Sequence, residues 1–201
     1  MCLDLAIRDV ASPLLRGAMG CALLAFLTRG LHLDGLADTA DGLLSARPAD
    51  EALVIMKDSA TGALGALTLS VTLILKTAAI SDIVQDGHTI DALLLVPMCS
   101  RLSLVVLASL SEYARREGGL GQYFVGKNAR GHLSVAMAVS LGVSMVVAGL
   151  KGVVLITIAS LIALMSARWF KRRLGGVTGD CLGAHLEVSE TLLFIVAALS
   201  A

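Results

Sequence analysis

The sequence predicts an all-α, polytopic integral membrane helical bundle, and two observations carry that prediction. Hydrophobic residues make up 56% of the 201 residues, only 16% are charged, and the mean hydropathy is +0.83. Soluble domains typically have about a quarter of their residues charged. In addition, apolar runs recur that are long enough, at roughly 20 residues, to cross a bilayer as helices. We therefore expect a single membrane-embedded domain over residues 1–201.

About six transmembrane helices are expected from these runs. In chain order they cover residues 14–33, 62–80, 90–110, 132–150, 152–168 and 182–200. Only a short turn around Lys151 separates the fourth segment from the fifth, which predicts a helical hairpin. The formal net charge of zero argues against a nucleic-acid partner. The apolar segments make the lipid bilayer the expected partner of the chain.

Basic residues are concentrated in alternate loops. The loop at 42–61 has two, the loop at 111–131 has four and the loop at 169–181 has three, whereas the loop at 81–89 has none. Lys and Arg accumulate in cytoplasmic loops. The three basic loops are therefore predicted to face the cytoplasm, with both termini on the other side of the cytoplasmic (inner) membrane.

The stretch HLDGLADTADGLL, residues 32–44, places three acidic side chains directly after the first apolar segment. Helical residues advance by about 100° each, so Asp34, Asp38 and Asp41 fall within about 60° of one another. Three like charges repel, and burial makes each charged form costlier still. A divalent cation reverses that balance, because Mg²⁺ prefers hard oxygen ligands. The alternative is a solvated helix end without a ligand.

A second acidic set lies near the C-terminus, in GGVTGDCLGAHLEVSET. Asp180 and Glu187 are seven residues apart, about two helical turns, so they share a face of one helix. Glu190 follows one turn later. The glycine-rich loop before this helix can present backbone amides to phosphate, and the basic run at 171–173 precedes that loop. Membrane orientation alone is the alternative role of these three basic residues.

Four further charged residues lie in or beside the apolar segments. Lys57 is expected either to contact a phosphate or to orient the second segment, and Asp58 either to bind metal or to pair with Lys57. Arg101 lies inside an apolar segment, where an ionisable group is a functional candidate by default. Its alternative role is an ion pair with one of the acids. Lys76 is expected to extend its ammonium group to the membrane surface.

Four stretches together resemble the cobalamin synthase family, the adenosylcobinamide-GDP ribazoletransferases. They occur in the family's order and are GLHLDGLADTADGL (30–43), IMKDSATGALGAL (55–67), EGGLGQYF (117–124) and GGVTGDCLGAHLEVSE (175–190). Family members usually have a further hydrophobic segment before the first of these motifs. The chain is therefore expected to have a shorter N-terminus than the family.

The resemblance implies a membrane transferase of cobalamin biosynthesis that acts at the last step of nucleotide-loop assembly. The implied reaction moves the adenosylcobinamide phosphate moiety from adenosylcobinamide-GDP to α-ribazole or its 5′-phosphate. GMP is released, adenosylcobalamin or its 5′-phosphate forms, and Mg²⁺ is the implied cofactor. The acid-rich helix is also analogous to that of the CDP-alcohol phosphotransferases, which use helix-borne aspartates with Mg²⁺.

In-line displacement at a pyrophosphate requires its negative charge to be neutralised and its reacting groups to be positioned, which carboxylate-bound metal ions achieve. The expected metal ligands are Asp34, Asp38, Asp41, Asp180 and Glu187. One of the first three is expected to take the proton of the attacking ribose hydroxyl, with Asp41 as the first choice. The candidate phosphate-binding residues are Lys57, Arg101, Arg172 and Arg173, and the further site acids are Asp58 and Glu190.

A small cation- or proton-coupled membrane transporter is the competing prediction, since buried acids and an arginine in a helical bundle can carry ions. Two features disfavour it. The acids lie at the predicted cytoplasmic ends of the segments rather than at mid-depth, and no internal repeat is present.

Overall fold

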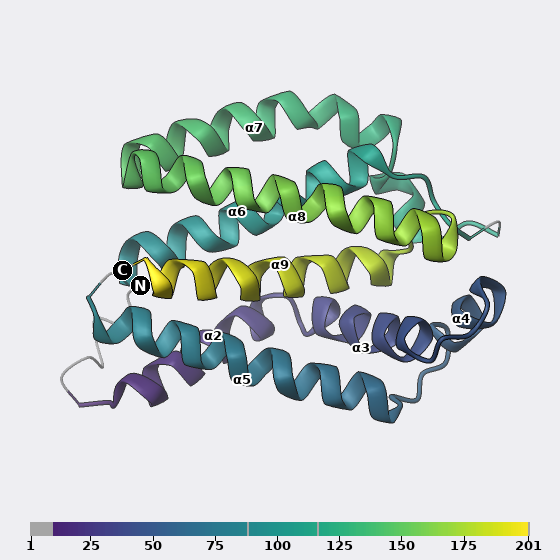
Figure 1. The fold of residues 1–201 in the computed structure, drawn as a ribbon, viewed down its shortest axis with the longest axis horizontal. Helices are drawn as coiled ribbons and strands as arrows, with labels where there is room; N and C mark the ends of the chain where they lie inside the picture. Colours follow the sequence, from purple (N-terminus) through teal and green to yellow (C-terminus); the bar gives the residue numbers. More distant parts are fainter. Residues whose placement is uncertain (1–9, 88, 116, 201) are drawn as a thin grey trace.

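The computed structural model describes residues 10–87, 89–115 and 117–200, which form eight α-helices and one short 3₁₀-helix without a β-strand. The long helices run roughly along a common axis as an elongated bundle (Figure 1). The predicted all-α fold class is confirmed. The elements are α2 (Pro13–Leu27), α3 (Leu31–Leu44), α4 (Ala49–Ile55), α5 (Ala63–Gln85), α6 (Thr89–Leu110), η1 (Leu120–Phe124), α7 (Lys127–Ala148), α8 (Leu150–Leu174) and α9 (Gly179–Leu199).

Helices α5 to α9 are each long and apolar enough to cross a membrane, and α2 with α3 makes a sixth span if the pair is counted as one. Five of the six predicted segments therefore correspond to single continuous helices. Only Gly149 separates α7 from α8, so the predicted helical hairpin is confirmed. The arrangement is that of a multi-pass membrane protein.

The expectation of one continuous helix over residues 14–33 is wrong. Helix α2 ends at Leu27, and α3 begins at Leu31 at an angle of 89° to it. Arg29 and Gly30 have φ angles of 52° and 71°, which a right-handed helix cannot accommodate. The aspartate-rich stretch therefore forms a helix of its own.

Helix α9 lies at the centre of the bundle and packs against α3, α5, α6 and α8. Its contact with α3 is close because glycines face each other across it. A Cβ atom at Gly35 would lie 2.8 Å from the carbonyl oxygen of Asp180, and one at Gly183 would lie 3.2 Å from the backbone of His32. Small residues allow membrane helices to approach in this way.

Three connections lie at one end of the bundle, on the right in Figure 1, with basic residues in them or in the helix turns beside them. They are residues 45–62, 111–126 and 175–178, which join α3 to α5, α6 to α7 and α8 to α9. The connections α5–α6 and α7–α8 lie at the opposite end. We call the first end the basic end.

Gly35→Ala is expected to destabilise the protein. The added methyl group meets backbone atoms of α9 that must move, and overpacking of this kind costs about 1–3 kcal/mol. Gly142→Ala in α7 is the matched control, because nothing lies within 4 Å of its Cβ position, and alanine favours a helix over glycine by about 1 kcal/mol. Thermal unfolding of the purified proteins in detergent measures the unfolding midpoints of the two variants. An equal or higher midpoint for Gly35→Ala would contradict the close α3–α9 contact.

Candidate active site

A cavity of about 810 Å³ opens near the basic end, lined by residues of α3, α6, α7, α9, η1 and the loop after α6. Small-molecule sites typically enclose about 300–1,000 Å³. The polar and charged side chains that line it are His32, Asp34, Arg115, Asn128, His132 and Asp180.

Asp180 occupies the first turn of α9, where its charge is favourable beside the helix N-terminus. Its carboxylate accepts a hydrogen bond from Arg115, with an Nη2–Oδ2 distance of 2.8 Å, and one of 3.2 Å from the Thr178 hydroxyl. Arg115 also donates to the carbonyl oxygen of Met56 at 3.4 Å. The arginine therefore links the loop after α6 to α9 and to the end of α4.

Asp34 and Asp38 extend from α3 toward the same region. The carboxylate of Asp38 interacts electrostatically with the negative charges of Asp34, Asp180 and Asp41 and with the positive charge of Arg115. The structure thus brings together three aspartates of α3 and one of α9, as the sequence predicted. Asp34 and Asp180 line the cavity directly.

Asp41 makes a contact that the sequence analysis did not foresee. Its two carboxylate oxygens accept hydrogen bonds from the backbone N–H groups of Gly62 and Gly65, at 2.7 and 2.8 Å. These groups belong to the N-terminus of α5, whose first N–H groups have no partner within the helix. Asp41 therefore caps α5. Asp34 and Asp38, the other carboxylates of α3, cap no helix in the described part of the chain.

The second acidic set is divided between two places. Glu187 and Glu190 point into the bundle, where the Lys76 ammonium group lies 2.5 Å from one and 3.1 Å from the other. Arg101 also pairs with Glu190, and the Ser100 hydroxyl donates to the same carboxylate. We call Lys76, Arg101, Glu187 and Glu190 the buried ion network.

This network corrects three expectations. Lys76 does not extend to the membrane surface, since only 3% of its side chain is exposed. Glu187 lies about 10 Å along α9 from Asp180 and is paired with Lys76 rather than grouped with the aspartates. Arg101 makes the ion pair that was the alternative to a phosphate contact.

The remaining predicted residues lie at the basic end. Lys57 pairs with Glu117 across 2.7 Å, and this hydrogen bond lowers the pKa of Glu117 below its ordinary value. Asp58 instead accepts the N–H of Ala60, so of the two alternatives for Asp58 the pairing with Lys57 is not formed. Arg172 and Arg173, in the last turn of α8, are both exposed. Arg173 donates a hydrogen bond to the carbonyl oxygen of Leu43 at the end of α3.

Within the described part of the chain, no group of three or more His, Cys, Asp or Glu side chains stands ready to hold a metal ion. Mg²⁺, however, commonly takes one or two protein carboxylates, several waters and the phosphates of a substrate. The oxygen donors of Asp34, Asp38 and Asp180 suit that chemistry. They do not by themselves make up a metal site.

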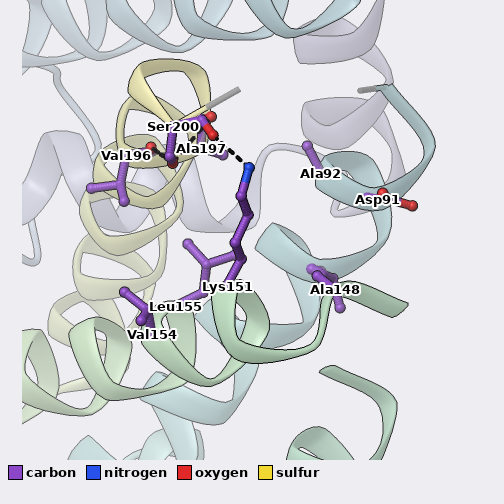
Figure 2. Close-up of a pocket in the computed structure, with 10 residues that line it drawn as sticks. Asp91, Ala92, Ala148, Lys151, Val154, Leu155, Val196, Ala197 and Ser200 are labelled. Atoms are coloured by element: carbon purple, nitrogen blue, oxygen red, sulfur yellow. Dashed lines mark hydrogen bonds between the residues drawn. The ribbon is translucent and has the colours of Figure 1, made fainter. Parts of the chain in front are cut away.

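A second cavity, of about 170 Å³, lies at the opposite end of the bundle (Figure 2). Its charged lining residues are Asp91 and Lys151, and the Lys151 ammonium group donates to the carbonyl oxygen of Ser200 at 2.8 Å. Most of the other lining side chains are aliphatic. Because this second cavity is small and has few polar side chains, the cavity near the basic end is the candidate active site.

Sequence reasoning treated Arg115 only as a loop charge and did not single out Asn128 or Tyr123. Loop residues carry no periodicity that would predict which side chain turns inward. The motif EGGLGQYF was the available signal, since it contains Tyr123 and precedes Asn128 by a few residues.

Comparison with known proteins gives a consistent result. A family model described as "Cobalamin-5-phosphate synthase" matches residues 1–198. The adenosylcobinamide-GDP ribazoletransferase of Syntrophobacter fumaroxidans (strain DSM 10017 / MPOB) is 42% identical over 196 residues, which cover 96% of this chain and 77% of the relative. The protein of the same name from Clostridium novyi (strain NT) is 38% identical over 181 residues, covering 89% of this chain and 72% of the relative. No solved structure shows a significant match.

Lys76→Met is expected to lower the free energy of unfolding by about 3–5 kcal/mol, because it leaves buried carboxylates short of a cation. Arg47→Met is the control. It breaks a pair with Glu51 whose side chains are 61% and 56% exposed, and exposed pairs contribute at most about 1 kcal/mol. Chemical unfolding in detergent compares the two. If Lys76→Met does not accumulate, a double variant with Glu187→Gln is expected to recover part of the loss.

Asp41→Ala is expected to cost about 1 kcal/mol of stability, the usual value of a lost helix cap. Asp34→Ala removes a carboxylate of the same helix that caps nothing and lies among like charges, so its unfolding midpoint is expected to equal or exceed that of the wild type. Thermal unfolding without substrate measures both. Equal midpoints for the two variants would contradict the capping role of Asp41.

Proposed function

The chain belongs to the cobalamin-5-phosphate synthase family, and we propose that it acts as an adenosylcobinamide-GDP ribazoletransferase. Its substrates are adenosylcobinamide-GDP and α-ribazole or α-ribazole 5′-phosphate. Its products are GMP and adenosylcobalamin or adenosylcobalamin 5′-phosphate, at the last step of nucleotide-loop assembly. The observation that carries the proposal is the convergence of Asp34, Asp180 and Arg115 at a cavity of small-molecule size, where the carboxylate of Asp38 interacts with all three.

The reaction is a displacement at phosphorus. The ribose hydroxyl of α-ribazole forms a new oxygen–phosphorus bond to the phosphate that carries the cobinamide. The bond from that phosphorus to the bridging oxygen of the pyrophosphate breaks, and GMP leaves with that oxygen. The hydroxyl loses one proton. Asp34 and Asp38 are the candidates to accept it, because the carboxylate of Asp41 and that of Asp180 already accept hydrogen bonds from other groups of the protein.

Mg²⁺ is the proposed cofactor, held by Asp34, Asp38 and Asp180. The clustered negative charge of these carboxylates favours a divalent cation, and one positive side chain, Arg115, does not balance it. When bound, the ion neutralises the pyrophosphate and stabilises the leaving GMP. The carboxylates of the chain orient the ion and the acceptor hydroxyl.

Arg115 is the strongest candidate to bind the pyrophosphate, because its guanidinium group already lies in the cavity beside Asp180. An arginine can bind phosphate through two parallel hydrogen bonds. Lys57, Arg172 and Arg173 form an outer basic rim that attracts the anionic substrates toward the basic end. Arg101 is committed to Glu190 and has no proposed role in phosphate binding.

We propose that the basic end faces the cytoplasm, across the cytoplasmic (inner) membrane. The basic residues of two connections, 45–62 and 111–126, and those of the last turn of α8 support this orientation through the positive-inside rule. It gives the soluble nucleotide substrates access to the cavity.

The transporter alternative receives no support from the ionisable groups inside the bundle. The buried ion network contains two cations and two anions that neutralise each other. Neither of the two cavities described above is lined by its members.

Asp34→Asn and Asp38→Asn are each expected to lower the transfer rate by about 100-fold or more, in line with the loss of a general base or a metal ligand. Membranes that contain each variant are incubated with adenosylcobinamide-GDP, α-ribazole and a series of Mg²⁺ concentrations, and cobalamin formation is followed. Asp86→Asn, an exposed change at the opposite end of α5, is expected to keep full activity. Wild-type rates in both Asp34→Asn and Asp38→Asn would reject the assignment of these carboxylates as proton acceptor or metal ligands.

A further inference from the structure

Aromatic side chains gather at the candidate active site of a chain that has few of them. The sequence contains only one Trp, two Tyr and four Phe. Both tyrosines, Tyr113 and Tyr123, and one phenylalanine, Phe124, line the cavity of about 810 Å³. Tyr123 and Phe124 are 64% and 67% exposed, so their rings are available to a ligand.

The backbone holds these rings at fixed positions. Tyr113 pairs with Val177 in an isolated β-bridge beside the start of α9, with an Ala114 N–H to Val177 carbonyl hydrogen bond of 2.9 Å. Tyr123 belongs to η1, and its carbonyl oxygen accepts a 3.0 Å hydrogen bond from the side chain of Asn128.

Glycines make room for the Tyr113 ring. A Cβ atom at Gly119 would collide with its hydroxyl group, and one at Gly121 would lie 3.1 Å from the ring edge. The motif EGGLGQYF therefore supplies both the space for one ring and the two other rings.

We propose that Tyr123 and Phe124, with Tyr113 beside them, stack against the aromatic base of the ribazole substrate and so position its ribose hydroxyl. The assignment rests on the proposed function. Aromatic side chains bind flat heterocycles by stacking, a contact that tolerates different bases because each has a π-face. The charged residues of the same cavity, Asp34, Asp180 and Arg115, lie within reach of the sugar and the phosphate.

Size favours this substrate over the other. A cavity of about 810 Å³ is large enough for a nucleoside, because sites of about 300–1,000 Å³ enclose drug-sized ligands. The whole of adenosylcobinamide-GDP, a corrin ring with side chains joined to a guanosine diphosphate, exceeds that volume, so only part of it can enter. The aromatic wall is therefore assigned to the smaller substrate.

The test uses full-length protein in membranes with Tyr123→Leu, Phe124→Leu and the double variant. The KM for α-ribazole is expected to rise about tenfold per residue, from the usual strength of base stacking, while the KM for adenosylcobinamide-GDP stays unchanged. Tyr123→Phe keeps the ring and is expected to keep the wild-type KM. Trp169→Leu is the control, because this 43% exposed aromatic residue of α8 does not line the cavity.

Equilibrium binding of labelled α-ribazole to the detergent-solubilised protein, without the second substrate, separates the two proposals. Binding that weakens in Tyr123→Leu supports the subsite even if no transfer is seen, and only the proposed reaction then fails. An increase in the KM for adenosylcobinamide-GDP alone overturns the subsite. Unchanged KM values with reduced membrane content of the variants also overturn it, and assign these aromatics to the membrane interface instead. A wild-type protein that neither binds α-ribazole nor transfers to it overturns both.

Discussion

The geometry of the bundle depends on the pairing of two carboxylates that α9 carries into its interior. An unpaired charge inside a bundle costs several kcal/mol, so Glu187 and Glu190 require cations, which α5 supplies as Lys76 and α6 as Arg101. These contacts fix the rotation of α9 about its own axis. Because Asp180 is seven residues before Glu187, on nearly the same face, that rotation also sets the direction of the aspartate at the cavity.

A second group of contacts positions α3 against this fixed helix. Gly35 and Gly183 let the two backbones approach closely, Asp41 caps α5, and Arg173 of α8 binds the carbonyl oxygen of Leu43 at the end of α3. Polar backbone groups at helix ends need partners, and at the basic end some of these partners come from neighbouring helices. The same contacts that satisfy the helix ends therefore hold Asp34 and Asp38 beside Asp180.

Sequence alone predicted most of the helices, because hydropathy and segment length are local properties. Helical spacing also predicted that Asp34 and Asp38 share a face of one helix, whereas the approach of Asp180, on another helix, was only a hypothesis that followed from the expected metal site. Sequence alone failed where the answer depended on neighbours. Lys76 turned inward because Glu187 and Glu190 lie opposite it, and Glu187 shares a face with Asp180 but lies two turns away. The break at Arg29 and Gly30 was missed because apolar residues continue on both sides of it.

Two sets of charged side chains, the buried ion network and the group beside the cavity, thus have opposite properties. The buried ion network contains equal numbers of cations and anions and is satisfied without a ligand; its side chains are almost fully buried except that of Arg101, which is 42% exposed. Beside the cavity, Asp38 of α3 interacts with the carboxylates of Asp34, Asp41 and Asp180, and Arg115 is the cation that interacts with it. Such an excess of negative charge raises the energy of the empty site. The first set fixes how α9 packs against α5 and α6, and the imbalance of the second is the basis of our proposal that a cation and an anionic substrate bind there together.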